Sequence, residues 1–63
     1  MTSTAPARIL IVEDERLIRE TLNAFIKAEG YSVVTAADGQ EALQFLKTDS
    51  FNLVITDLKI PGH

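Results

Sequence analysis

Four consecutive aliphatic residues, Ile9-Leu10-Ile11-Val12, constrain the fold of this chain more than any other feature of its sequence. A strand with one face in water alternates apolar and polar residues. This run does not alternate, which is typical of a strand buried on both faces of a parallel sheet. We therefore predict that residues 8–12 form the central strand of such a sheet.

The next segment has a helical pattern. Residues 15–29 place apolar side chains on one stripe at helical spacing, and Gly30 supplies the stop expected just past a helix. The stripe consists of Ile18, Leu22, Phe25 and Ile26, and Leu17 extends it. We interpret Phe25 and Tyr31 as core or edge residues.

Two further strands and one further helix follow. Residues 31–36 are rich in β-branched and aromatic side chains, which predicts a second strand nearer a sheet edge. Asp38 and Glu41 have the spacing of a capping box and predict a short helix over residues 39–47. Residues 51–56 form a third apolar run of strand length.

The element order is therefore β-α-β-α-β, which is typical of the α/β class with parallel strands. Right-handed crossovers leave few ways to wind such a chain. With the first strand in the centre, the spatial order is 2-1-3, with one helix on each face of the sheet.

Composition excludes several classes of function. The 63 residues include no Cys, so no disulfide or thiolate metal site braces a small core, and a reducing cytoplasm is compatible with the sequence. The net charge of −3 argues against direct binding of nucleic acid. We expect residues 1–7 to be a flexible tail without the pattern of a secretory signal, and no apolar run is long enough to span a membrane.

Three carboxylates follow the predicted strands. Glu13 and Asp14 come directly after the first strand and Asp57 ends the third, so the winding brings them to one crevice at the carboxyl ends of the strands. Their mutual repulsion calls for raised pKa values or a bound cation, and hard oxygen ligands favour Mg²⁺ or Mn²⁺. An Asp beside such an ion can act as a nucleophile toward phosphorus. The alternative is that Asp14 or Glu15 only caps the first helix.

Three segments resemble the receiver domains of two-component response regulators. They are Ile9-Leu10-Ile11-Val12-Glu13-Asp14-Glu15, Ala37-Asp38-Gly39-Gln40-Glu41-Ala42 and Val54-Ile55-Thr56-Asp57-Leu58-Lys59-Ile60-Pro61-Gly62. The resemblance implies a flavodoxin-like fold and assigns roles to four residues. Asp57 matches the phosphoacceptor, Asp14 a direct ligand of the metal, Glu13 a neighbour that acts through water, and Lys59 a ligand through its main-chain carbonyl.

The resemblance also implies partners and a location. A histidine kinase or a phosphotransfer protein would supply the phosphoryl group in the cytoplasm, and the chain would be a phosphoacceptor rather than an enzyme. A complete receiver has five βα units, so residues 8–63 correspond to its N-terminal half. The other half normally supplies a hydroxyl residue and a lysine that contact the phosphoryl group, so we expect phosphoryl transfer by these residues alone to be impaired.

A second hypothesis is a structural or dimerisation module. The third strand would present an open edge, and a homodimer could form through this edge or through bare sheet faces. His63 is a lone terminal histidine, and we assign it no role. No G-x-G-x-x-G or G-x-x-x-x-G-K-[ST] motif occurs, so the sequence does not indicate nucleotide binding.

Overall fold

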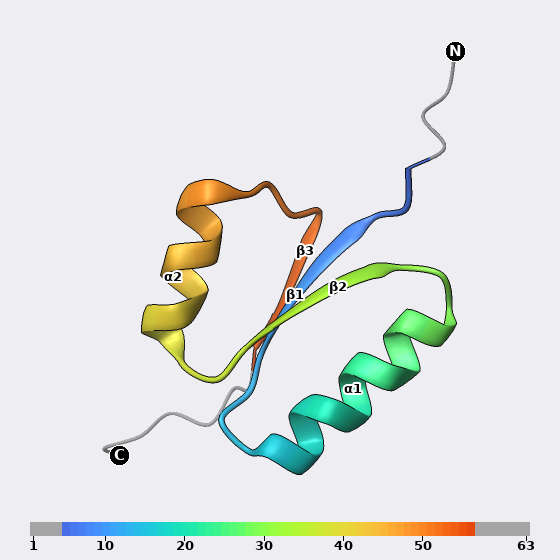
Figure 1. Ribbon diagram of the computed structural model, residues 1–63, viewed down its shortest axis with the longest axis horizontal. Helices are drawn as coiled ribbons and strands as arrows, with labels where there is room; N and C mark the ends of the chain where they lie inside the picture. Colours follow the sequence, from blue (N-terminus) through green and yellow to red (C-terminus); the bar gives the residue numbers. More distant parts are fainter. Residues whose placement is uncertain (1–4, 57–63) are drawn as a thin grey trace.

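The computed structural model describes residues 5–56. Within this range the chain forms β1 (Arg8–Val12), α1 (Arg16–Ala28), β2 (Ser32–Ala36), α2 (Gly39–Thr48) and β3 (Leu53–Thr56). The strands are parallel, and β1 pairs with β2 on one side and β3 on the other, which confirms the predicted α/β fold and its order 2-1-3 (Figure 1). Neither helix of the described range has the length and apolar content needed to cross a bilayer.

The centre of the core is β1. Leu10 and Ile11 have no exposed surface and Ile9 is 5% exposed, which explains why the sequence of this strand does not alternate. Each such side chain contributes about 1.5–3 kcal/mol relative to an exposed position. The helices α1 and α2 lie on opposite sides of the strands (Figure 1). Leu10 forms a core cluster on the α2 side with Ala36 and Ala42, and Val12, Val34, Phe45 and Phe51 pack around it.

Both helix ends predicted from the sequence are confirmed. Gly30 has φ +99°, a conformation that favours glycine, and its N–H donates to the carbonyl of Lys27. At the start of α2, Asp38 Oδ1 accepts from the N–H of Glu41 at 2.8 Å. The Glu41 carboxylate in turn accepts from the N–H of Ala37 at 2.6 Å, so each acidic side chain satisfies one backbone donor.

The predicted apolar stripe of α1 is only partly buried. Leu22 and Ile26 are half-buried, but Phe25 is 68% exposed and Leu17 is 72% exposed. Phe25 and Tyr31, which we interpreted as core or edge residues, are therefore not in the core, and Tyr31 is 43% exposed. For Phe25 the reason is that the apolar arc of α1 is wider than the strip that packs on β1 and β2. An open hollow on this helix is lined by Leu17, Glu20, Thr21, Ala24 and Phe25.

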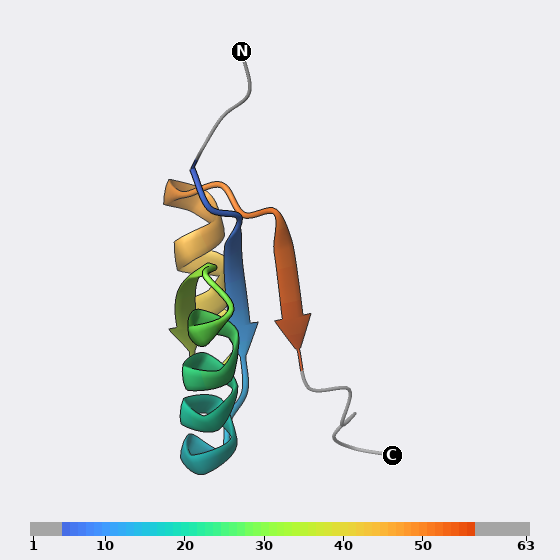
Figure 2. The same cartoon turned by 90° about the vertical axis from the view of Figure 1, so that its right-hand side faces the viewer.

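The strand β3 stands at the edge of the sheet, away from both helices (Figure 2). Within residues 5–56, both helices pack on β1 and β2, and no Cα atom of either helix lies within 8 Å of a Cα atom of β3. Leu53 and Val54 are accordingly 52% and 42% exposed.

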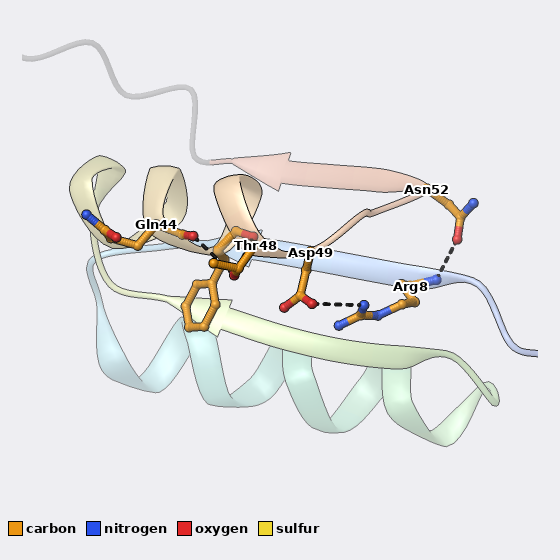
Figure 3. Close-up of polar contacts among 6 residues, drawn as sticks. Arg8, Gln44, Thr48, Asp49 and Asn52 are labelled. Atoms are coloured by element: carbon orange, nitrogen blue, oxygen red, sulfur yellow. Dashed lines mark hydrogen bonds and ion pairs between the residues drawn. The ribbon is translucent and has the colours of Figure 1, made fainter.

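A polar cluster joins the segment before β3 to the start of β1 (Figure 3). The N–H of Arg8 donates to Asn52 Oδ1 at 2.7 Å, and the N–H of Asn52 donates to the carbonyl of Arg8 at 2.8 Å. The Arg8 guanidinium lies 3.5 Å from a carboxylate oxygen of Asp49 and 5.0 Å from the centre of the Phe51 ring. These two hydrogen bonds, one between backbone groups and one from the Arg8 N–H to the Asn52 side chain, set the register of β3 against β1, while the exposed ion pair adds little.

Candidate functional site

The carboxyl ends of all three strands lie at the same end of the sheet, because the strands are parallel (Figure 2). Val12 is the last residue of β1, and it pairs with Ala36 at the end of β2 and with Thr56 at the end of β3. The candidate site is therefore built from the residues that follow these three. Residues 13–15, which connect β1 to α1, are called the acidic loop below.

Glu13 extends the sheet by one residue. Its N–H donates to the carbonyl of Ala36 at 3.0 Å, which continues the pairing with β2 beyond Val12. Its side chain points inward and only 5% of the residue is exposed. The carboxylate oxygen Oε2 accepts from the N–H of Glu15 at 3.0 Å. Glu13 therefore has a structural role in the loop besides any contact with an ion.

The Glu15 side chain does not cap the start of α1. Glu15 is the N-cap residue and has an extended backbone, but its side chain makes no capping hydrogen bond. The carboxylate that accepts from the Glu15 N–H is that of Glu13, two residues earlier. The acidic loop is instead closed by Glu13, which is also the last residue of the β1–β2 pairing.

Asp14 follows Glu13 and is exposed to solvent. A buried and an exposed carboxylate thus lie next to each other in the acidic loop. Mg²⁺ needs only one or two carboxylates and completes its octahedron with waters and substrate oxygens, so this donor set fits the ion. Within residues 5–56 no group of three or more His, Cys, Asp or Glu side chains lies close enough together to hold a metal.

Two of the predicted site residues lie outside the described part of the chain. Asp57 follows Thr56, the last described residue, and Lys59 lies two residues further. The structure therefore brings Glu13 and Asp14 to the end of the sheet where β3 also ends. The metal-binding roles of Glu13 and Asp14, like the roles of Asp57 and Lys59, stay predictions.

One residue of this region was not predicted from the sequence. Arg19, in the first turns of α1, donates from Nη1 to the main-chain carbonyl of Glu13 at 2.8 Å. Side chains of a helix point toward its N-terminus, so a long basic residue one turn after the N-cap can reach back to the preceding loop. That spacing was the signal that could have identified it.

Comparisons with known proteins identify the family of the chain. The family model of the response regulator receiver domain matches residues 9–63. Aerobic respiration control protein ArcA of Escherichia coli strain K12 is 52% identical over 54 residues, which are 86% of this chain and 23% of that protein. Transcriptional regulatory protein PdtaR of Mycobacterium tuberculosis is 45% identical over 60 residues, which are 94% of this chain and 29% of that protein.

Solved structures have the same fold. Chemotaxis protein CheY4 of Vibrio cholerae superposes with a TM-score of 0.85 at 38% identity, over 90% of this chain and 48% of that one. Response regulator TrrA of Thermotoga maritima, solved in complex with Mg²⁺-BeF, has a TM-score of 0.80 at 45% identity, over 89% and 49%. The chain thus spans about a quarter of the length of the curated relatives and about half of the solved chains. Because the family model covers nearly the whole sequence, the chain belongs to the response regulator receiver domain family of two-component systems.

Proposed function

We propose that this receiver domain is a phosphoacceptor. Its phosphoryl donor is a phosphohistidine of a histidine kinase or a phosphotransfer protein, and the acceptor is the carboxylate of Asp57. The ion is Mg²⁺, with Mn²⁺ as the alternative. Its protein ligands are Glu13 through a water molecule, Asp14, Asp57 and the main-chain carbonyl of Lys59.

The register of β1 against β3 carries this proposal. Val12 and Thr56 are paired, and the acidic loop begins one residue after Val12. Asp57 is the residue that follows Thr56 in the sequence. Three carboxylates thus follow paired strand ends at the edge where open parallel sheets bind ligands. The TrrA structure, which contains Mg²⁺-BeF, supports the choice of ion.

The chemistry is a displacement at phosphorus. An oxygen of the Asp57 carboxylate forms the new bond, the bond between phosphorus and the imidazole nitrogen breaks, and its electron pair stays on that nitrogen. Bound Mg²⁺ supplies positive charge beside the phosphoryl oxygens. Without a cation, Glu13 and Asp14 would repel the incoming anion. We place this reaction in the cytoplasm and, given the net charge of −3, propose no direct contact with nucleic acid.

A small acyl phosphate tests the proposal without the cognate kinase. The chain is incubated with acetyl phosphate and Mg²⁺, and intact-mass spectrometry follows the addition of one phosphoryl group. We expect labelling that needs the divalent ion and that Asp57→Asn removes. Because the chain spans about half of the solved receivers, we also propose slower labelling than in a chain that includes the rest of a receiver domain.

A matched control removes a different carboxylate. Asp49 is exposed and pairs with Arg8 at the opposite end of β1, so Asp49→Asn should be labelled like the unmodified chain. Equal labelling of Asp57→Asn, or labelling that is unchanged when EDTA removes the ion, would contradict the proposal.

The exposed edge of the sheet supports a second function, self-association. Leu53 and Val54 are 52% and 42% exposed on a strand that lies away from both helices of the described range. A second copy could pair with β3 about a two-fold axis, antiparallel, to give a continuous sheet of order 2-1-3-3-1-2.

Light scattering at micromolar concentration tests this association. We expect about twice the 6.9 kDa mass of the chain, falling on dilution. Val54→Lys should shift the equilibrium to monomer, whereas Leu43→Lys, which adds the same charge at a residue of α2 that is 58% exposed, should not. A folded monomer that persists over the whole concentration range would exclude this function.

A further inference from the structure

The strand β3 has less support than its neighbour β1. Leu10 and Ile11 of β1 have no exposed surface, whereas no residue of β3 is buried and only Ile55 is partly buried. β3 also lies away from both helices of the described range (Figure 2). Segments with few buried apolar contacts open at a lower free energy than the rest of a fold. The closure of β3 on β1 therefore depends strongly on polar contacts.

Asn52, the residue before β3, makes two hydrogen bonds with Arg8 at the start of β1. Its N–H donates to the carbonyl of Arg8 at 2.8 Å, and its Oδ1 accepts from the N–H of Arg8 at 2.7 Å (Figure 3). Asn52 thus bonds to both polar groups of the Arg8 backbone. The two residues lie 44 positions apart in the sequence, so these bonds form only when β3 is docked on β1.

The residues before Asn52 are held by other contacts. Phe51 packs against the core cluster around Leu10, on the α2 side of the sheet. The Asp49 carboxylate lies 3.5 Å from the Arg8 guanidinium, but both side chains are more than a third exposed, so this ion pair contributes little. The contact of Phe51 with the core can persist when β3 leaves β1, which places a hinge between Phe51 and Asn52.

We propose that β3 is a strap that opens and closes on β1 while the rest of the fold stays intact, with the Asn52 side chain as its latch. Opening separates Thr56 from Val12, its partner at the far end of the two strands. The latch, at the opposite end of the sheet, therefore controls how long these strand ends stay together. The inference goes beyond the proposed function, because it requires neither a metal ion nor phosphorylation.

Hydrogen exchange of the ¹⁵N-labelled chain, followed by NMR without Mg²⁺, tests the strap. The protected amides of β3 are compared with the Ser32 amide, which donates to the carbonyl of Ala7 at 2.9 Å on the other side of β1. We expect faster exchange in β3. Low concentrations of urea should accelerate exchange at Ser32 more than in β3, because opening of β3 alone exposes little surface. This measurement needs no substitution.

Three variants test the latch. Asn52→Ala removes the acceptor of the Arg8 N–H and should accelerate exchange in β3 about 5-fold, as for loss of one hydrogen bond, with little change at Ser32. Asn52→Asp keeps an acceptor oxygen and should exchange like the unmodified chain. Arg8→Gln removes the ion pair with Asp49 and the contact with the Phe51 ring but keeps the backbone N–H. It should change exchange in β3 less than about 2-fold.

Several outcomes would overturn the proposal. Equal acceleration in β3 and at Ser32, by urea or by Asn52→Ala, would show that β3 opens only with the whole fold. An effect of Arg8→Gln as large as that of Asn52→Ala would remove the latch from the Asn52 side chain. Exchange is also measured at two chain concentrations, since opening within one chain is independent of concentration. Protection of β3 that falls on dilution would assign it to a second copy instead of the latch.

Discussion

Two substitutions of Glu13 can separate the structural role of its carboxylate from its role toward an ion. The residue is 5% exposed, and Oε2 accepts from the N–H of Glu15 at 3.0 Å. Glu13→Gln keeps an oxygen that can accept this hydrogen bond but removes the negative charge. Glu13→Ala removes both. We therefore expect Gln to preserve the fold and weaken Mg²⁺ binding, and Ala to damage both.

The size of the stability loss follows from the contact. Leaving a buried backbone donor without an acceptor costs about 1–3 kcal/mol. Glu15 is exposed, so water can replace part of the bond, and we expect about 1 kcal/mol for Glu13→Ala. A chain of 63 residues has a total unfolding free energy of about 3–9 kcal/mol, so this is a measurable fraction. In a domain of this size it corresponds to a decrease in Tm of about 4–8 °C.

Thermal unfolding followed by far-UV circular dichroism, without Mg²⁺, measures this loss. Glu13→Gln should have the Tm of the unmodified chain or a higher one, because a buried charge has been replaced by a neutral amide. A titration with MgCl₂ should then show about 10-fold weaker binding by this variant. The reasoning would be refuted if Gln lowered Tm as much as Ala, or if Gln bound Mg²⁺ as tightly as the unmodified chain.

Three further predictions concern the site and the fold. Millimolar Mg²⁺ should raise the Tm of the chain, because a ligand that binds only the folded state stabilises it by mass action. It should have little effect on the Tm of Asp14→Asn, and an equal rise in both chains would argue against Asp14 as a ligand. Leu10→Ala should lower the unfolding free energy by about 2–5 kcal/mol in urea titrations, whereas Leu43→Ala, the same change at a position 58% exposed, should alter it by less than about 0.5 kcal/mol. Asp38→Ala should lower the unfolding free energy by about 1 kcal/mol through loss of the α2 cap, whereas Asp38→Asn should keep most of the capping stability. Equal losses in the two variants would show that the side-chain cap contributes little.

The arrangement of the sheet was predictable because it depends on patterns that local sequence contains. An aliphatic run without polar interruptions is stable only with both faces covered, and Leu10 and Ile11 are fully buried as that argument requires. Gly30 and the Asp38–Glu41 pair specify helix ends through backbone conformation and short-range hydrogen bonds. These effects act over a few residues, so distant parts of the chain do not alter them.

Burial of the α1 side chains was less predictable, because periodicity identifies an apolar arc on the helix but not how much of that arc the sheet covers. Leu22 and Ile26 face the sheet, while Phe25 and Leu17 lie beyond the strip that β1 and β2 cover. The same limit applies to Arg19, whose contact with Glu13 depends on how α1 leaves the loop. Helical spacing assigns a side chain to a face of the helix, whereas the position of the helix axis determines which residues pack against that face.

The different environments of Glu13 and Asp14 follow from the point where the pairing of β1 with β2 ends. Glu13 still donates to Ala36 and therefore keeps a strand-like position, which turns its carboxylate inward to the Glu15 amide. Asp14 is the next residue and is open to water. The Glu13 carboxylate thus closes the loop, whereas the Asp14 side chain is exposed to solvent. A change that ended the pairing one residue earlier would displace both carboxylates at once, so under the proposed function it would lower both the stability of this end of the sheet and the affinity for Mg²⁺.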